Sequence, residues 1–269
     1  MENALQLGLL YAPVALGLLL SYRILKIADM TTDGSFTLGC AVSAMGTLAG
    51  YPYWALLWAA IAGVASGSVT AILQTKGNIP GILAGIITNT GLYTIHLLVM
   101  GFSANVSLLQ STTVFSQSRW IPLILIPSAL GFLLFWFLKT RVGLSVRATG
   151  DNPSMVRSSS INPHVPITVG LCLSNGLVAL SGGLLAQYQR TADINLGTGM
   201  VVTGLASVML GDRFCPGFPI FGAILGSMVY RLMMAFALRL DIPSECFKLI
   251  TAGIVALAIG LAGKRGQVC

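Results

Sequence analysis

The chain has 269 residues, of which 55% are apolar and 9% are charged, and its formal net charge is +7. Ordinary soluble domains carry about 25% charged residues, so this composition excludes a separate soluble domain. The basic excess does not indicate nucleic acid, because the Lys and Arg residues are spread over short segments between long apolar runs. In a membrane protein such an excess is a signal of orientation.

Several apolar runs reach the ~20 residues that a helix needs to cross a hydrocarbon core of about 30 Å. The period-2 alternation of a membrane β-barrel is absent. The sequence therefore predicts an all-α, polytopic membrane protein with a single transmembrane domain over 1–269 and about nine membrane-spanning helices. The expected spans are residues 4–22, 34–50, 53–74, 79–101, 120–138, 165–188, 196–210, 218–238 and 247–261. The second and seventh are short and glycine-rich, so we expect short or broken helices there.

Lysine and arginine are distributed unevenly between alternate loops. If residues 139–164 lie in the cytoplasm, most of the basic residues fall on that side, which places the N-terminus outside and the C-terminus in the cytoplasm. The expected inside cations are Arg23, Lys26, Lys76, Lys139, Arg141, Arg147, Arg157, Arg213, Lys264 and Arg265. The expected outside cations are Arg119, Arg190, Arg239 and Lys248. The longest expected outside loop, 102–119, is rich in Ser, Thr and Gln, and we expect an exposed docking surface there.

Two segments of the chain resemble each other. ALGLLLSYRILKIADMTTDGSFTLGCAVSAM ends at Met45, and ALSGGLLAQYQRTADINLGTGMVVTGLASVM ends at Met209. With the orientation above, the first Ala-Asp pair faces inward and the second outward, so the copies are inverted, unless the likeness between two glycine-rich apolar segments is due to chance. Inverted repeats with interrupted helices are typical of transporters, and the interruptions tend to mark the substrate site. We assign 4–101 to the first repeat and 165–263 to the second.

Residues 139–164, KTRVGLSVRATGDNPSMVRSSSINPH, form the polar segment between the two repeats. A short amphipathic piece is followed by Gly-Asp-Asn-Pro, where Asp151 or Asn152 can cap a helix that begins with proline. We expect this helix over 153–160, with residues 155–157 on a surface that meets water or another protein. It is either a site that a cytoplasmic partner grips or a solvated connection.

The fourth expected span carries a polar face. Asn89, Tyr93 and His96 fall at i, i+4 and i+7, on one side of a helix, with Thr88 beside them. Polar groups inside a span usually face the bundle interior or a cavity, and an aromatic face with an amide can bind an amino acid side chain. The alternative is hydrogen bonding between helices, worth about 0.6–2 kcal/mol per bond.

Polar residues also gather at the two glycine-rich interruptions. Those that we assign to the substrate pathway are Asp29, Thr32, Asp33, Ser35, Asp193 and Asn195. A carboxylate there can attract a substrate amine or cap the half-helix that follows it, and capping is favoured for Asp33 because it stands directly before Gly34.

Arg231 lies inside the eighth expected span, where an arginine costs about 2.5–3.5 kcal/mol on translocon scales. Its long stem either carries the guanidinium outward or lets it pair with an acid on a neighbouring helix. A role in binding a substrate carboxylate is a third interpretation.

The sequence contains no pattern for catalysis or for a cofactor. The five cysteines, Cys40, Cys172, Cys215, Cys246 and Cys269, have neither metal-ligand nor CxxC spacing, so we expect no metal site and no disulfide framework. HExxH, GxSxG and the P-loop GxxxxGK[ST] are absent, so we expect no enzyme, and the energy for transport has to come from elsewhere. An ion-coupled secondary transporter is the alternative function, with Asp29 and Asp33 as its candidate ion site.

Three stretches together resemble a known family. LYAPVALGLLLSYRILKIADMTTDGSFTLG, GLSVRATGDNPSMVRSSSIN, and SNGLVALSGGLLAQY with GLASVMLGD are similar to permease subunits of ABC importers in the branched-chain amino acid and ribose permease group. Within the group, residues 81–101 and TTDGSF at 31–36 resemble the branch of importers of tryptophan, tyrosine or related molecules. Gly-Asp at 211–212 stands where many sugar and branched-chain permeases have paired glycines, so their substrates are not carried over.

The resemblance implies a permease that binds no cofactor itself. It implies a homodimer in the bacterial inner (plasma) membrane, a cytoplasmic ABC ATPase dimer that holds ATP and Mg, and an extracytoplasmic binding protein. It implies import of a small solute, expected to be an amino acid and favoured to be an aromatic one. The helix at 153–160 corresponds to the ATPase-coupling segment, with Arg147, Gly150, Asp151, Asn152, Pro153, Met155, Val156 and Arg157 as coupling residues.

Overall fold

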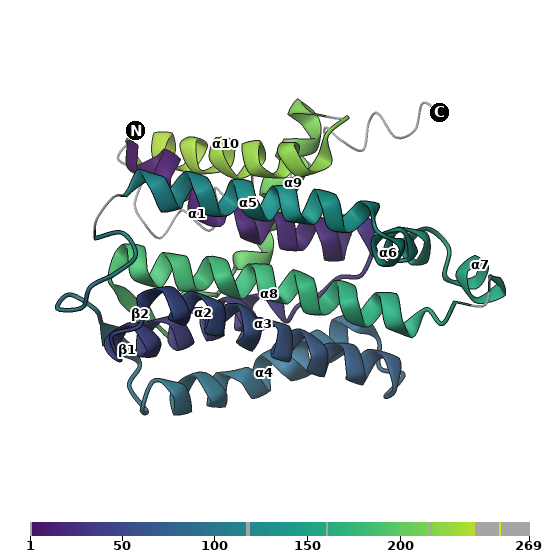
Figure 1. Cartoon of the computed structure of the whole chain (residues 1–269), viewed down its shortest axis with the longest axis horizontal. Helices are drawn as coiled ribbons and strands as arrows, with labels where there is room; N and C mark the ends of the chain where they lie inside the picture. The colour runs from purple at the N-terminus through teal and green to yellow at the C-terminus, as the bar shows by residue number, and fades with distance from the viewer. Residues whose placement is uncertain (1, 117–118, 160, 216, 240–252, 254–269) are drawn as a thin grey trace.

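The computed structural model is built almost entirely from α-helices (Figure 1). This confirms the predicted all-α fold. Among the described residues, six helices are long and apolar enough to cross a membrane, which confirms a polytopic membrane protein. The predicted ninth span, 247–261, lies outside the described part of the chain, so the count of nine stays a prediction. The structure describes residues 2–116, 119–159, 161–215, 217–239 and 253.

The helices follow the predicted spans closely. They are α1 (Glu2–Leu18), which continues as the π-helix η1 (Leu19–Ile24), α2 (Thr32–Leu48), α3 (Pro52–Thr75), α4 (Gly81–Val99), α5 (Trp120–Lys139), α6 (Arg141–Asp151), α7 (Pro153–Ser158), α8 (His164–Gln189), α9 (Met200–Phe214) and α10 (Pro219–Arg239). Two short strands, β1 (Asn105–Ser107) and β2 (Thr191–Asp193), complete the fold.

Helix α8 lies at the centre of the bundle, in contact with α1, α2 and α3 (Figure 1). Its closest contacts depend on glycine. A Cβ atom on Gly63 of α3 would strike the carbonyl oxygen of Asn175 in α8, and one on Gly182 of α8 would strike that of Phe36 in α2. Helices in a membrane associate by such close packing, because the surrounding lipid is as apolar as their side chains.

The helices α2 and α9 are short, as predicted for the second and seventh spans. They have 17 and 15 residues, and at ~1.5 Å per residue they are about 25 and 22 Å long. That is less than a hydrocarbon core of ~30 Å. Non-helical residues lead into both helices, at 25–31 and 194–199. Helix α9 begins at Met200, four residues after the expected start of the seventh span, because turns occupy 194–199.

The two strands pair antiparallel, with Val106 opposite Ala192. The loop 102–119, predicted as an exposed docking surface, is therefore bonded to the second interruption. Leu108 and Phe115 of this loop are buried, so the prediction is wrong for this part. The expected exposure fails at these residues because the apolar side chains of the loop are buried against the bundle.

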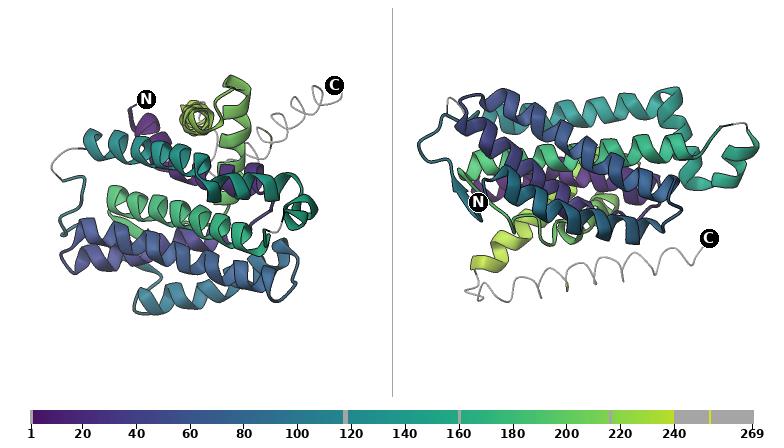
Figure 2. Two further views of the ribbon diagram at one scale, coloured as in Figure 1. Left: turned by 45° about the vertical axis from the view of Figure 1, so that its right-hand side comes forward. Right: turned by 90° about the horizontal axis from the view of Figure 1, so that it is seen from below.

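The bundle has two distinct ends. We call them the sheet end, where β1 and β2 lie, and the α7 end, from which α6 and α7 project (Figures 1 and 2). Arg23 of η1 pairs with Asp212 of α9, so α9 runs toward the α7 end. Gln187, near the sheet end of α8, donates a hydrogen bond of 3.1 Å to the hydroxyl of Ser43 in α2, so α2 runs toward the sheet end. Helices α2 and α9 thus run in opposite directions, as the two copies of an inverted repeat would. The bounds of the repeats stay a prediction. Which end of the bundle faces the cytoplasm also stays a prediction.

Candidate functional site

The N-termini of α2 and α9 meet at Asp33. Its two carboxylate oxygens accept hydrogen bonds from the backbone N–H groups of Gly199 (3.0 Å) and Val201 (2.9 Å). The first N–H groups of a helix have no partner within it, so Asp33 satisfies donors of α9. The prediction that Asp33 caps the helix that follows it is wrong. Helix α2 already begins at Thr32, which puts the Asp33 carboxylate in the first turn and beside the neighbouring half-helix.

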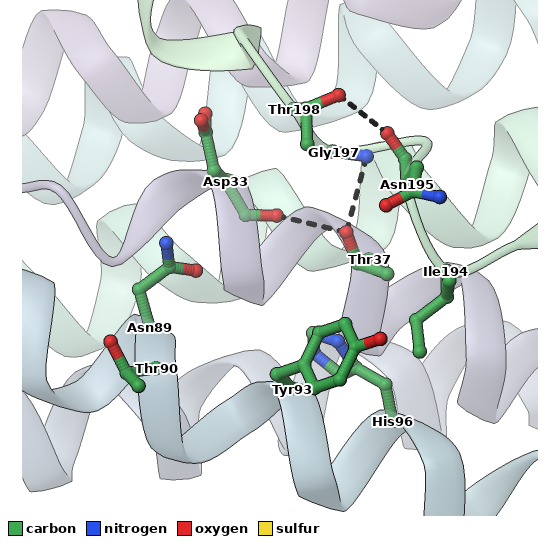
Figure 3. Close-up of a pocket in the computed structure, with 10 residues that line it drawn as sticks. All are labelled: Asp33, Thr37, Asn89, Thr90, Tyr93, His96, Ile194, Asn195, Gly197 and Thr198. Carbon is green, nitrogen blue, oxygen red and sulfur yellow. Dashed lines mark hydrogen bonds between the residues drawn. The ribbon is translucent and has the colours of Figure 1, made fainter.

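A cavity of about 330 Å³ opens beside this junction (Figure 3). Ligand pockets in proteins span about 300–1,000 Å³, so the volume suits a small solute. The hydroxyl of Thr37 holds the cavity wall together, because it donates to the carbonyl of Asp33 (3.1 Å) and accepts from the N–H of Gly197 (3.1 Å). The lining residues are Asp33, Thr37, Asn89, Thr90, Tyr93, His96, Ile194, Asn195, Gly197 and Thr198.

The polar face of α4 forms one wall of the cavity, with Tyr93 and His96 side by side (Figure 3). His96 is only 3% exposed, and its Nε2 atom has no hydrogen-bond partner among the described residues. A buried polar atom without a partner costs about 1–3 kcal/mol. His96 lines the cavity, but its Nε2 atom is covered by the protein, so a molecule in the cavity can supply the missing partner only if the imidazole turns. Tyr93 is 53% exposed and presents its ring to the same space.

Half of the predicted pathway residues come together here. Those that line the cavity are Asp33, Asn89, Tyr93, His96 and Asn195. Their role in binding a substrate stays a prediction.

Asp29 and Ser35 belong to a different, closed cluster between α2, α3 and α8. The Asn175 amide donates to one carboxylate oxygen of Asp29 (2.6 Å), and the N–H of Thr31 donates to the other (2.8 Å). The Ser35 hydroxyl donates to the Asn175 side-chain oxygen (2.7 Å) and lies 2.7 Å from the Ser66 hydroxyl. The candidate ion site of a secondary transporter would need Asp29 and Asp33 to face one common space. They do not, because Asp29 is enclosed in this cluster and Asp33 lines the cavity.

The other predicted pathway residues make local bonds. The hydroxyl of Thr32 donates to the carbonyl of Asp29 (3.2 Å), and that of Thr88 to the carbonyl of Ala84 in its own helix (2.9 Å). Asp193 lies in β2 and accepts from the N–H of Asn195 (2.7 Å). None of these three lines the cavity.

Sequence reasoning missed half of the cavity wall. The residues it missed are Thr37, Thr90, Ile194, Gly197 and Thr198. Two signals were present, because Thr37 stands one helical turn after Asp33 and 194–198 are part of the second interruption. The sequence did not predict that the two interruptions, one before α2 and one before α9, would lie against each other.

A family model described as "Branched-chain amino acid transport system / permease component" matches residues 1–260. The chain belongs to this family. The resemblance to permeases of ABC importers is therefore confirmed, and the protein is a permease subunit of a transport system.

Several curated relatives are similar over most of this permease. A tyrosine transport system permease protein of Clostridioides difficile is 37% identical over 92% of this chain and 86% of its own length. An uncharacterised protein of Rickettsia prowazekii is 34% identical over 96% and 95%. A ribose import permease of Escherichia coli K12 is 25% identical over 98% and 85%. No solved structure matches the permease.

The central segment of the permease forms α6 and α7. Of the two predicted caps, Asn152 is the one used, since its side-chain oxygen accepts from the N–H groups of Ser154 (3.1 Å) and Met155 (3.2 Å). Asp151 instead accepts from Lys26 at 2.9 Å. A Cβ atom on Gly150 would overlap the carbonyl oxygen of Ile24, so α6 lies directly against the end of η1.

The expected exposed surface on α7 is only partly present. Met155 is 66% exposed and Arg157 is exposed, but Val156 is 4% exposed. The prediction is wrong for Val156 because α7 packs against α6, and one side of so short a helix is thereby covered. Pro153 begins α7, and Arg147 lies exposed on α6.

Arg231 of the permease stacks on an aromatic ring. Its guanidinium carbon lies 3.6 Å from the ring centroid of Tyr11 in α1, a cation–π contact. The side chain therefore does not follow the outward path, which was the first of the three interpretations. Among the described residues its partner is this ring and not an acid.

The described residues contain no group of three His, Cys, Asp or Glu side chains that could hold a metal ion. Cys40, Cys172 and Cys215 are free thiols. Cys246 and Cys269 lie outside the described residues, as do Lys248, Lys264 and Arg265.

Proposed function

We propose that this permease imports an amino acid through the cavity at the α2–α9 junction, and that an aromatic amino acid such as tyrosine is the first candidate. The observation that carries the proposal is the cavity itself. It combines two half-helix N-termini, an exposed aromatic ring and a buried imidazole nitrogen without a partner. A similar permease of Clostridioides difficile is named for tyrosine transport, whereas the similar Escherichia coli permease is named for ribose.

The chemistry of the cavity suits a zwitterion. Helix N-termini carry about half a positive charge each and favour a carboxylate, while the Asp33 carboxylate balances part of that charge and favours an ammonium group. Tyr93 offers a ring face against which an aromatic side chain can stack. A phenol hydroxyl can supply the hydrogen bond that His96 Nε2 lacks once the imidazole turns toward the cavity.

We further propose that two copies of the chain form the transport unit. A cytoplasmic ABC ATPase dimer with bound ATP and Mg drives it, and an extracytoplasmic binding protein delivers the solute. The α7 end then faces the cytoplasm, with the N-terminus outside and the C-terminus inside. The excess of basic residues on the α7 side supports this orientation, and the exposed Met155 and Arg157 suit contact with the ATPase.

The substrate role is tested by Asn89→Leu, with Thr94→Leu on the same helix but outside the cavity as the control. In proteoliposomes that also contain the ATPase and the binding protein, we expect Asn89→Leu to lower tyrosine uptake at least tenfold, about 1.4 kcal/mol of lost binding. We expect Thr94→Leu to stay within twofold of the unaltered permease. Equal effects would mean that Asn89 serves helix packing. Uptake without any ATPase would contradict the importer itself.

The coupling role is tested by the double change Met155→Ser and Arg157→Ser, which leaves the buried Val156 in place. We expect ATP hydrolysis that no longer responds to the loaded binding protein, with normal amounts of permease in the membrane. Val165→Ser, which alters an exposed residue outside 139–164, should leave the response intact. Normal stimulation of hydrolysis in the double variant would contradict the coupling role.

A further inference from the structure

A second cavity lies between α5 and α10 at the α7 end, away from the Asp33 junction. It has a volume of about 810 Å³. The two helices touch sparsely, and they approach each other at Gly131, where a Cβ atom would lie 3.1 Å from the side chain of Ile224. Phenylalanines from both helices line the space. We call it the α5–α10 groove.

The groove walls are apolar and uncovered by the rest of the described chain. Phe132 of α5 and Phe218, just before α10, are each 72% exposed, and Phe221 is 57% exposed. Both helices are long and apolar enough to cross a membrane, so this space opens toward the hydrocarbon region. A slot of this kind accepts a hydrocarbon chain without leaving any polar group unsatisfied.

The end of the groove near α6 is positively charged. Arg23, Arg147 and Asp151 lie there. Asp151 is paired with Lys26, and Arg23 with Asp212. Arg147 is exposed and has no acid partner among the described residues. Within the described part of the chain, Arg147 is therefore a guanidinium without an ion-pair partner at one end of an apolar slot.

We propose that the α5–α10 groove binds an anionic phospholipid of the bilayer. One acyl chain lies between α5 and α10, and the phosphate diester receives hydrogen bonds from Arg147. Guanidinium groups suit phosphate oxygens because their N–H donors match them in pairs. The bound lipid bridges α10 to α6, the helix that carries α7, so the lipid composition can act on the coupling segment.

The test uses the full-length permease, delipidated in detergent and titrated with phosphatidylglycerol or with phosphatidylcholine of the same acyl chains. Native mass spectrometry counts the bound lipids. We expect phosphatidylglycerol to bind more tightly, and Arg147→Gln to weaken it about fivefold, as one basic residue near an anionic lipid contributes. Phosphatidylcholine has the same phosphate diester but no net charge, so Arg147→Gln should weaken its binding less than that of phosphatidylglycerol. Arg141→Gln, on the same helix but outside the groove, is the matched control.

Gly131→Leu fills the groove and should weaken both lipids equally, which separates the acyl contact from the charge contact. The proposal is overturned if the unaltered permease binds both lipids alike, or if Arg141→Gln acts as strongly as Arg147→Gln. It is also overturned if Gly131→Leu leaves lipid binding unchanged while it separates dimers, because a second copy of the chain would then occupy the groove. Should Gly131→Leu fail to fold, the two surface arginine variants still decide the headgroup site.

Discussion

Asp29 and Asp33 lie in the same interruption of the chain, yet their surroundings are opposite. Asp29 is 4% exposed, and both of its carboxylate oxygens are bonded within a closed cluster that joins three helices. Asp33 binds the start of α9 and stands on the wall of a cavity. Polar residues within a membrane are costly and serve either packing or transport. Each carboxylate oxygen of both residues accepts a hydrogen bond, so the difference is that Asp29 is sealed between helices whereas Asp33 faces a cavity.

The largest effect is expected at the closed cluster. Asn175→Leu removes the amide that binds Asp29 at 2.6 Å and leaves a buried carboxylate oxygen without its partner. A loss of about 3 kcal/mol in stability is expected, at the upper end for a buried hydrogen bond that involves an acid. The thermal unfolding midpoint of the purified permease in detergent measures it.

Asn195→Leu is the matched control, because Asn195 is exposed on the cavity wall. Asn195→Leu should change the stability by no more than about 0.5 kcal/mol. Of the two asparagine variants, Asn195→Leu should have the larger effect on uptake. If both asparagine variants unfold alike, the distinction between the closed cluster and the cavity fails.

A smaller effect is expected at Asp33. Asp33→Ala removes the acceptor for the N–H groups of Gly199 and Val201, which should cost about 1–2 kcal/mol, as loss of a helix cap does. Asp33→Asn keeps one side-chain oxygen and should recover part of this. Hydrogen exchange at the amides of 199–201 reports the change directly, and we expect it to speed up in the alanine variant. Unchanged exchange would mean that α9 begins without help from α2.

These residues also mark where sequence reasoning stops. The face of Asn89, Tyr93 and His96 was predictable, because it follows from the helical period within one segment. The partner of Asp33 was not, since its bonded groups lie 166 and 168 residues away and no local pattern indicates such a contact. The short lengths of α2 and α9 were predicted from the short apolar runs in the sequence, but the meeting of their N-termini was not.

Short elements were the second limit. The strands β1 and β2 have three residues each, too few for an alternating pattern to be recognised. The burial of Val156 was missed for the same reason, because a helix of six residues does not complete two turns and gives no periodic signal. Its buried side depends on contact with α6, which the sequence does not reveal.

A smaller change in stability than at Asp33 is expected at Thr37, where the cavity and the packing of α2 meet. Thr37→Val keeps the shape of the side chain but removes the hydroxyl that accepts from Gly197 and donates to Asp33. The loss should be about 0.5–1 kcal/mol, the net value of an ordinary hydrogen bond. Thr47→Val on the same helix is the control, since the Thr47 hydroxyl is equally buried but donates only to the carbonyl of Ser43, one turn back.

The two threonine variants should differ in transport more than in stability. Gly197 is part of the cavity wall, so loss of its bond to Thr37 frees the residues 194–198 to shift, and the concentration of tyrosine that gives half-maximal uptake should rise severalfold. Thr47→Val should leave that concentration unchanged. If both variants alter uptake equally, the bond between Thr37 and Gly197 matters only for packing, and the open cavity would differ from the closed Asp29 cluster in shape but not in role.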